Sequence, residues 1–291
     1  MKKKLSIFDM GVYAVAFLLV LIVLYPLILV VSYSISDPSM VARGEILLLP
    51  KGINLEGYKF IFKDKDMMTG YANTIFYTVF GTMINLIVTV PAGYVLSKNR
   101  TVPGNKIFMT MFMITMYFSG GMIPTFLLVN SLGLYNTRWV LLIMGAFSTY
   151  NCIICRSFFA AMPKELEESA VIDGCSVIGT FMKIVLPLSK ALLGVMVLYF
   201  AVGHWNSYFN AMIYIRDDSM QPLQVFLRRI LILAQQQAQG EDLGEYAELL
   251  MQREALIRYA VIVVSSLPLM IVYPFLQKFF EKGVLIGSVK G

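Results

Sequence analysis

The chain has 291 residues, of which 58% are hydrophobic and only 14% are charged, and its mean hydropathy is +0.71. Soluble domains carry about 25% charged residues, so this composition excludes an ordinary soluble domain and indicates an integral membrane protein. The formal net charge of +6 is explained by Lys and Arg beside the apolar segments, and it implies no nucleic-acid partner.

The apolar residues gather into long segments, which we predict to be the spans of a single all-α membrane domain covering residues 1–291. A helix needs about 20 apolar residues to cross a hydrocarbon layer about 30 Å thick. Helices are required because lipid cannot satisfy backbone N–H and C=O groups. The six predicted spans are 10–36, 70–97, 107–129, 138–159, 189–214 and 257–278.

The positions of Lys and Arg predict that both termini face the cytoplasm, because cytoplasmic loops carry an excess of these residues. Basic residues lie before the first span, in the 98–106 loop and in the C-terminal tail. The first span is longer than a signal-peptide core and lacks a convincing cleavage site, so we expect it to be uncleaved. The outer loops are then 37–66 and 216–258, with a shorter one at 130–138, and 163–187 lies inside.

Two spans contain local features with a structural interpretation. In the third, Gly120, Gly121 and Pro124 predict a kink or an interruption, because Pro removes a backbone hydrogen bond and Gly is conformationally permissive. In the fourth, Cys152 and Cys155 form a C-x-x-C pair without a second Cys or His pair for zinc. We interpret these two cysteines as small apolar residues in a packed helix.

The predicted cytoplasmic segment 163–187, "PKELEESAVIDGCSVIGTFMKIVLP", is far more polar than its surroundings. Three Glu residues crowd the start of its first predicted helix, where the helix dipole favours negative charge. Gly174 is typical of a helix C-terminus, and a second short helix can begin near Ser176. The segment is therefore predicted to form a helix-turn-helix and not a flexible loop.

The spacing of Glu168-Ser169-Ala170, Gly174, Ile184 and Leu186-Pro187 resembles the EAA-type loop of permease subunits of bacterial ABC importers. The one departure is Ser169, where that family usually has Ala. In the family this loop forms a coupling helix that sits in a cleft of a separate ATPase subunit. The resemblance implies that the ATPase-coupling residues are Glu168, Ser169, Ala170, Asp173, Gly174, Ile184, Leu186 and Pro187.

A wider resemblance links the chain to carbohydrate-type permeases of the same superfamily. Segments 199–217, 221–231 and 281–291 are similar to those of permeases for complex oligosaccharides, including uronic-acid-containing polysaccharide fragments. The resemblance implies a multi-pass protein of the bacterial cell membrane with several partners. These are a second, homologous permease subunit, two cytoplasmic ATPase subunits and an external solute-binding protein.

The chain lacks the G-x-x-x-x-G-K-[ST] pattern of a phosphate-binding loop. We therefore expect no enzymatic activity, cofactor or metal in this chain by itself, with ATP and Mg bound by partner subunits. Two alternatives are an ion-coupled carrier or channel subunit and a membrane scaffold that only binds partners. Ion-coupled carriers place ionisable residues inside the membrane. The central parts of these spans lack Asp, Glu, Lys and Arg, and His204 is the one candidate they offer for such a role.

A sugar path needs hydrogen-bonding groups beside aromatic rings, and the end of the fifth span has this composition. Asn206 and Asn210 are four residues apart and would share one face of a continuous helix. An aromatic belt at the membrane surface is the alternative interpretation. The candidate path residues are His204, Trp205, Asn206, Tyr208 and Asn210, with Asn73, Asn85 and Tyr117 as weaker candidates.

The outer segment 216–258 is long for a simple connection. Its length, glutamines and acidic residues predict a contact with the external binding protein. The candidate contact residues are Gln235, Gln236, Gln237 and Glu241. A solvated acidic loop is the alternative.

Overall fold

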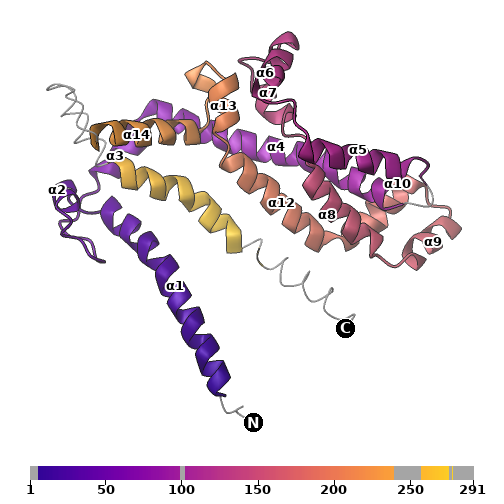
Figure 1. The fold of residues 1–291 in the computed structure, drawn as a ribbon, viewed down its shortest axis with the longest axis horizontal. Helices are drawn as coiled ribbons and strands as arrows, with labels where there is room; N and C mark the ends of the chain where they lie inside the picture. Colours follow the sequence, from indigo (N-terminus) through magenta and orange to yellow (C-terminus); the bar gives the residue numbers. More distant parts are fainter. Residues whose placement is uncertain (1–5, 99–101, 239–256, 275–276, 278–291) are drawn as a thin grey trace. The chain divides into compact units, whose positions relative to one another are not determined.

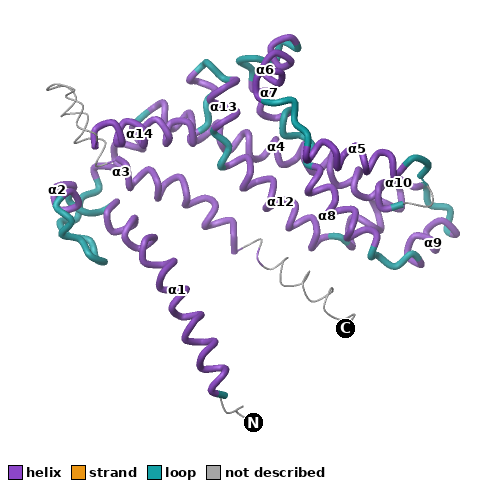
Figure 2. The backbone as a smooth tube through the Cα atoms, viewed as in Figure 1, coloured by secondary structure: helices purple, strands orange, loops and turns teal. Residues whose placement is uncertain are grey.

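The computed structural model describes residues 6–98, 102–238, 257–274 and 277 of the chain. Throughout these ranges the regular structure is helical, with turns and loops between helices and no strand (Figures 1 and 2). The predicted all-α fold class is confirmed for this part of the chain.

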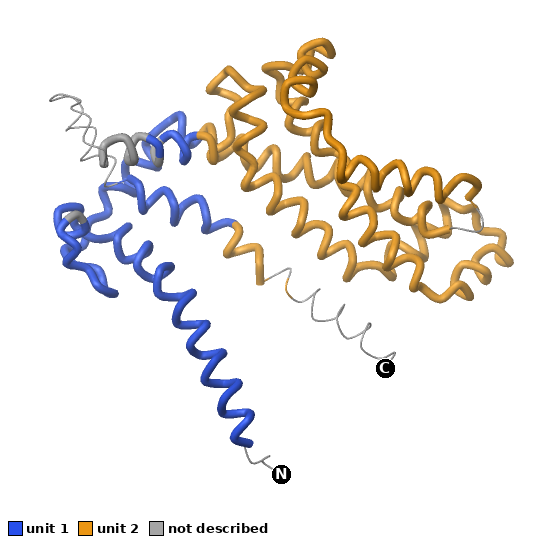
Figure 3. The backbone as a smooth tube through the Cα atoms, viewed as in Figure 1, with its two compact units in different colours: residues 1–68, 226–268 blue, residues 69–225, 269–291 orange. Residues whose placement is uncertain are grey.

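The chain divides into two compact units, coloured separately in Figure 3. The first unit consists of residues 1–68 and 226–268, and the second consists of residues 69–225 and 269–291. Every contact described below joins residues of the same unit.

Helix α1 (Ile7–Ser34) is the principal helix of the first unit. It begins after Ser6, whose side chain accepts a hydrogen bond from the Phe8 N–H while its own N–H donates to Asp9 Oδ2 at 3.0 Å. These reciprocal bonds satisfy donors that have no partner within the helix. Residues 10–34 carry no charge, and none of the most apolar window of α1 is buried within the protein. A helix that is apolar on all sides suits contact with hydrocarbon.

The C-terminal end of α1 is tied to the following segment, which includes α2 (Pro38–Ala42) and α3 (Glu56–Lys63). Ser32 Oγ donates to the Leu48 carbonyl at 2.5 Å, and Ser34 Oγ lies 2.7 Å from the Tyr58 hydroxyl of α3. Both serine side chains are buried, and these hydrogen bonds satisfy their hydroxyl groups.

Helix α4 (Lys65–Ser97) passes from the first unit into the second and is 33 residues long. The rest of the second unit is a series of shorter helices. They are α5 (Asn105–Tyr117), α6 (Met122–Ser131), α7 (Arg138–Ile143), α8 (Thr149–Ala160), α9 (Glu165–Ile172), α10 (Val177–Thr180), the π-helix η1 (Phe181–Val185), α11 (Leu186–Leu188), α12 (Lys190–Trp205), α13 (Phe209–Tyr214) and the 3-10 helix η2 (Asp218–Met220). Helix α14 (Leu223–Ala238) begins in this unit and ends in the first.

Two buried apolar clusters hold the second unit together. One surrounds Tyr77 and Tyr214, and the other surrounds Tyr94, Cys155 and Met196. Cys155 is fully buried and Cys152 nearly so, and neither forms a disulfide. A Cβ atom on Gly93 would overlap the Cys155 Cβ, so helices α4 and α8 approach closely there. The two cysteines pack as small apolar residues, as predicted.

Three described helices are long and apolar enough to cross a membrane, namely Ile7–Ser34, Lys65–Ser97 and Ile257–Pro274. Two pairs of consecutive helices, each bent at a short break, are also long and apolar enough to cross a membrane when the two helices of a pair are counted together. Helices α5 and α6 meet at 114°, and the segments Val177–Leu188 and Lys190–Trp205 meet at 82°. The first bend contains Gly121 with a φ of +85°, so the predicted interruption of the third span is confirmed.

The fourth predicted span, 138–159, is not one continuous helix. It consists of α7 and α8, with the non-helical residues 144–148 between them. The fifth, 189–214, is also divided, because α12 ends at Trp205 and α13 begins only at Phe209.

Candidate coupling site and transport path

The hairpin formed by α9 and α10 lies at one end of the second unit (Figure 1). Helix α9 has three Glu residues in its first turn and ends at Ile172, and Gly174, two residues later, has a φ of +76°. The Cys175 N–H donates to the Ala170 carbonyl at 2.9 Å across that turn. Glycine adopts this left-handed conformation without steric cost, so Gly174 closes the helix as predicted.

The second arm of the hairpin begins at Ser176, whose side chain accepts a hydrogen bond from the Gly179 N–H at 3.1 Å. This N-cap starts α10, so the prediction of a second short helix near Ser176 is confirmed. The chain then continues through η1, which contains Ile184, and α11, which contains Leu186 and Pro187.

The hairpin exposes both acidic and apolar side chains on its outside. Glu168, Ser169 and Asp173 are exposed, and so are the large apolar side chains of Ile172 and Ile178. Ala170 is the exception among the candidate coupling residues of α9, because only 2% of its surface is accessible. Exposed apolar side chains gathered on a polar hairpin mark a surface that binds another protein or the membrane.

Glu167 differs from its acidic neighbours because it turns toward the rest of the unit. Its carboxylate pairs with the Lys98 ammonium group, which lies just after the last residue of α4. The Lys98 Nζ also lies 4.8 Å from the centre of the Tyr94 ring. Tyr94 packs against Phe181 of η1 at a centroid distance of 4.9 Å. The C-terminal end of α4 therefore contacts α9 through Glu167 and the adjoining η1 through Phe181.

His204, the candidate path residue of α12, packs against α4 in this structure. Its Nε2 lies 2.6 Å from Asn85 Oδ1, and the Asn85 amide donates in turn to the Gly145 carbonyl. Because an amide oxygen only accepts hydrogen bonds, Nε2 carries the proton in this arrangement. A Cβ atom on Gly81 would overlap the imidazole ring. Gly81 therefore makes the space that the ring occupies.

Asn73 lies near the other end of α4 and is 3% exposed. Its amide donates to the Ser219 carbonyl at 2.8 Å and to the Gln221 carbonyl at 3.1 Å. The Tyr77 hydroxyl donates to the Met220 carbonyl at 2.8 Å, and the Leu223 N–H donates to Thr74 Oγ1 at the same distance. In this structure Asn73 holds the segment before α14, and a role in the sugar path stays a prediction.

The other candidate path residues do not gather around one site. Trp205 is buried and packs edge-on against Tyr71, with ring centroids 5.8 Å apart. Asn206, Tyr208 and Asn210 are exposed, and Tyr117, at the end of α5, is 83% exposed.

The prediction that Asn206 and Asn210 share one face of a continuous helix is wrong. Asn206 follows the last residue of α12, whereas Asn210 belongs to α13. The Asn206 amide donates to the Val202 carbonyl of α12 at 3.0 Å. The Asn206 backbone N–H bonds the same carbonyl at 3.1 Å, but the Ser207 N–H bonds the His204 carbonyl at 3.2 Å, so the α-helical pattern stops after Asn206.

The candidate residues for contact with a binding protein fall at the edge of the described chain. Gln235, Gln236 and Gln237 belong to the last turns of α14, and the structure describes their backbone only. Glu241 lies outside the described residues. Their role stays a prediction.

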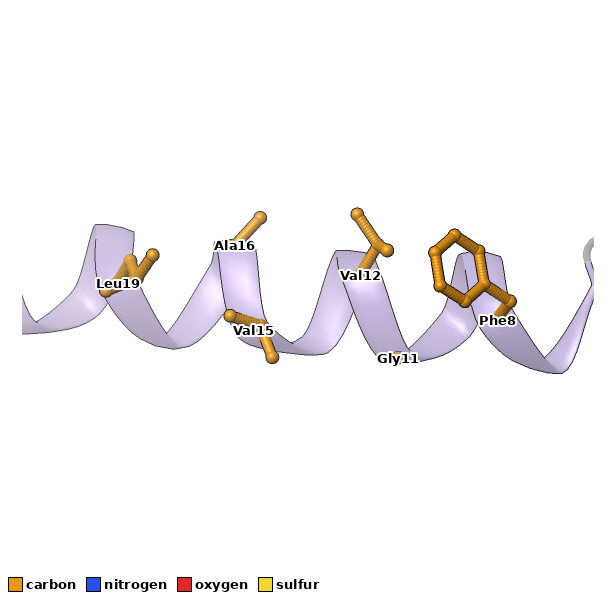
Figure 4. Close-up of a pocket in the computed structure, with 6 residues that line it drawn as sticks. All are labelled: Phe8, Gly11, Val12, Val15, Ala16 and Leu19. Carbon is orange, nitrogen blue, oxygen red and sulfur yellow. The ribbon is translucent and has the colours of Figure 1, made fainter.

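Figure 4 shows an apolar hollow on one side of α1. Its lining residues are Phe8, Gly11, Val12, Val15, Ala16 and Leu19. All of them belong to a single helix, and none offers a polar side chain to a sugar. In the described part of the chain, no cluster of His, Cys, Asp or Glu is arranged to hold a metal ion.

Sequence reasoning did not identify the contacts of Lys98, Tyr94 and Glu167. Lys98 and Glu167 are 69 residues apart, so no helical or strand periodicity relates them. The only available signal was a short basic loop and an acidic hairpin on the same predicted side of the membrane.

The described helices define an all-helical protein with candidate membrane-spanning helices and one polar hairpin. The chain belongs to the family described as binding-protein-dependent transport system inner membrane component, whose profile matches residues 67–286. This family membership makes it a transport permease component and confirms the resemblance drawn from the hairpin.

Individual relatives support the same assignment. Protein LplC of Bacillus subtilis is 43% identical over 93% of this chain and 90% of its own length. The Polygalacturonan/rhamnogalacturonan transport system permease protein YtcP of the same organism is 40% identical over 99% of this chain and 100% of its own length. A crystal structure of a bacterial ABC transporter that imports the acidic polysaccharide alginate contains a chain with a TM-score of 0.84 and 36% identity. That match covers 96% of this chain and 99% of the other.

Proposed function

We propose that the protein is one permease subunit of an ATP-driven importer of oligosaccharides or polysaccharide fragments, with acidic fragments as the preferred substrates. The observation that carries the proposal is the exposed α9–α10 hairpin, whose motif matches the coupling loop of the family. The substrate class is supported by the relatives named for polygalacturonan and for alginate.

In this proposal the chain crosses the bacterial cell membrane six times, with both termini in the cytoplasm. Helices α5 and α6 together form the third span, α7 with α8 forms the fourth, and α12 with α13 forms the fifth. The excess of Lys and Arg on the side of the hairpin supports this orientation. A second, homologous permease subunit pairs with this chain, two ATPase subunits bind beneath, and a solute-binding protein delivers the sugar outside.

Transport then proceeds by alternating access. ATP, bound with Mg by the partner subunits, draws those subunits together and moves the hairpins that sit in them. The helices of the permease pair tilt and open the path outward, and hydrolysis returns them to the inward-open state. The hairpin suits this task because it is short, helical and covalently continuous with α12.

The main alternative is an ion-coupled sugar carrier or a channel subunit, and a transport assay separates the possibilities. The complex is purified through a tag on this chain, reconstituted in liposomes with its binding protein, and supplied with oligogalacturonides outside. We expect uptake that requires ATP on the hairpin side and is insensitive to ionophores. Uptake without ATP that an ionophore abolishes would establish the carrier instead.

A matched neutral substrate tests the sugar class. Maltodextrins of the same length, presented with the same binding protein, are expected to stimulate neither uptake nor ATP hydrolysis. Equal stimulation by both sugars would contradict the preference for acidic fragments without affecting the role of the chain as a permease.

A further inference from the structure

The ion pair between Lys98 and Glu167 connects two parts of the chain that are distant in sequence. Their side chains are only 25% and 20% exposed, so the pair is shielded from most of the solvent. Charge-assisted hydrogen bonds of this kind are shorter and stronger than neutral ones. The Lys98 cation also follows the C-terminus of α4, where a positive charge is favoured by the helix dipole.

Aromatic packing reinforces the same connection. The Tyr94 ring lies edge-on to Phe159 of α8, with centroids 5.6 Å apart, and it also contacts Phe181 beyond the second arm of the hairpin. The end of α4 is therefore attached to the first arm of the hairpin by charge through Glu167, and to η1, which directly follows the second arm, by ring packing through Phe181.

Side chains of neighbouring helices also hold the end of α4. Arg156 Nε of α8 donates to the Leu96 carbonyl at 3.1 Å, and the Asn105 amide of α5 donates to the same carbonyl at 3.0 Å. The last carbonyls of a helix have no partners within it. These bonds satisfy one of them and prevent the end of α4 from fraying.

From this end α4 continues as one helix to Asn73, Thr74 and Tyr77, which bind the segment 219–223 through four hydrogen bonds. Polar contacts hold helices in register inside a membrane, because the lipid offers no substitute partners. Helix α4 therefore has polar attachments at both ends, one to the hairpin and one to the segment that leads into α14.

We propose that Lys98 is a positioning residue that makes α4 move with the hairpin and so transmits hairpin motion to segment 219–223. The inference rests on the proposed function of the chain as an ATP-driven permease. Without the ion pair, the hairpin follows the ATPase subunits while α4 lags behind, and ATP is hydrolysed with little sugar moved.

The test compares Lys98→Gln, Glu167→Gln and the double variant in the reconstituted complex, with imported sugar per hydrolysed ATP as the readout. We expect each single variant to lower this ratio by roughly fivefold or more, the lower range of coupling between distant sites. The double variant is expected to be no worse than either single one, because both substitutions remove the same interaction. Lys106→Gln is the matched control, since Lys106 is exposed and forms no ion pair among the described residues.

A ratio in Lys98→Gln equal to that of the wild type would overturn the inference, and so would independent losses that multiply in the double variant. If Lys98→Gln does not assemble, Lys98→Arg decides, because it retains the cation. That variant must restore both assembly and coupling, and its failure would also contradict the inference. A wild-type complex that hydrolyses ATP but imports no oligosaccharide would instead contradict the proposed function.

Discussion

The imidazole of His204 donates a hydrogen bond to the side-chain oxygen of Asn85 over 2.6 Å and so joins α12 to α4. Asn85 is 1% exposed, and its side-chain amide donates a second hydrogen bond to the Gly145 carbonyl. One asparagine thus holds together three segments of the second unit that lie far apart in the sequence.

We expect Asn85→Leu to destabilise the protein by about 1–3 kcal/mol, because the buried imidazole N–H and the Gly145 carbonyl lose their partner. Thermal unfolding in detergent, followed by tryptophan fluorescence, measures the change. Asn206→Leu is the control, since Asn206 is exposed and its amide bonds the Val202 carbonyl four residues earlier. Equal melting temperatures for Asn85→Leu and the wild type would show that the connection is not structural.

Gly81→Ala and Gly203→Ala form a pair of matched substitutions on facing helices. A methyl group at Gly81 would overlap the His204 ring, whereas one at Gly203 meets nothing within 4 Å. Overpacking of this kind costs about 1–3 kcal/mol, while Ala at an open helical position is neutral or slightly stabilising. A lower melting temperature for Gly81→Ala alone is expected. A similar decrease in both variants would argue against the close approach.

Gly174→Ala tests the turn of the hairpin separately from its contacts. The position has open space around it, but its φ is +76°. An alanine there is therefore strained in its backbone, which costs about 1–2 kcal/mol of folding free energy. We expect weaker retention of the ATPase subunits during purification, with Gly174→Asn less affected because Asn tolerates this conformation. Retention of the ATPase by Gly174→Ala at the wild-type level would contradict a role for the rigid turn.

Asn73→Ala removes two of the bonds that hold segment 219–223 on α4. We expect faster hydrogen exchange at the backbone amides of this segment, because low protection follows from lost tertiary contacts. Exchange in the hairpin at 165–180 serves as the internal reference, and we expect it to be the same in Asn73→Ala and in the wild type. If exchange in 219–223 matches the wild type, Asn73 does not hold the segment.

The amino-acid sequence by itself determined the membrane character, the interruption at Gly120-Gly121, the hairpin and its closure by Gly174. These features depend on composition, helix propensity and backbone conformation, which act over a few residues. The same local reasoning overestimated the continuity of the fourth and fifth spans. A run of apolar residues shows only that a segment suits hydrocarbon, and it does not show where the helix within it ends.

Only the tertiary structure decided which polar side chains meet. It paired Lys98 with Glu167, Asn85 with His204 and Asn73 with segment 219–223, and it separated Asn206 from Asn210. These contacts arise because helix packing brings distant segments to within hydrogen-bond range, and buried polar groups in an apolar interior must find partners there. The partner of each group depends on how the helices cross, which no local pattern in the chain records.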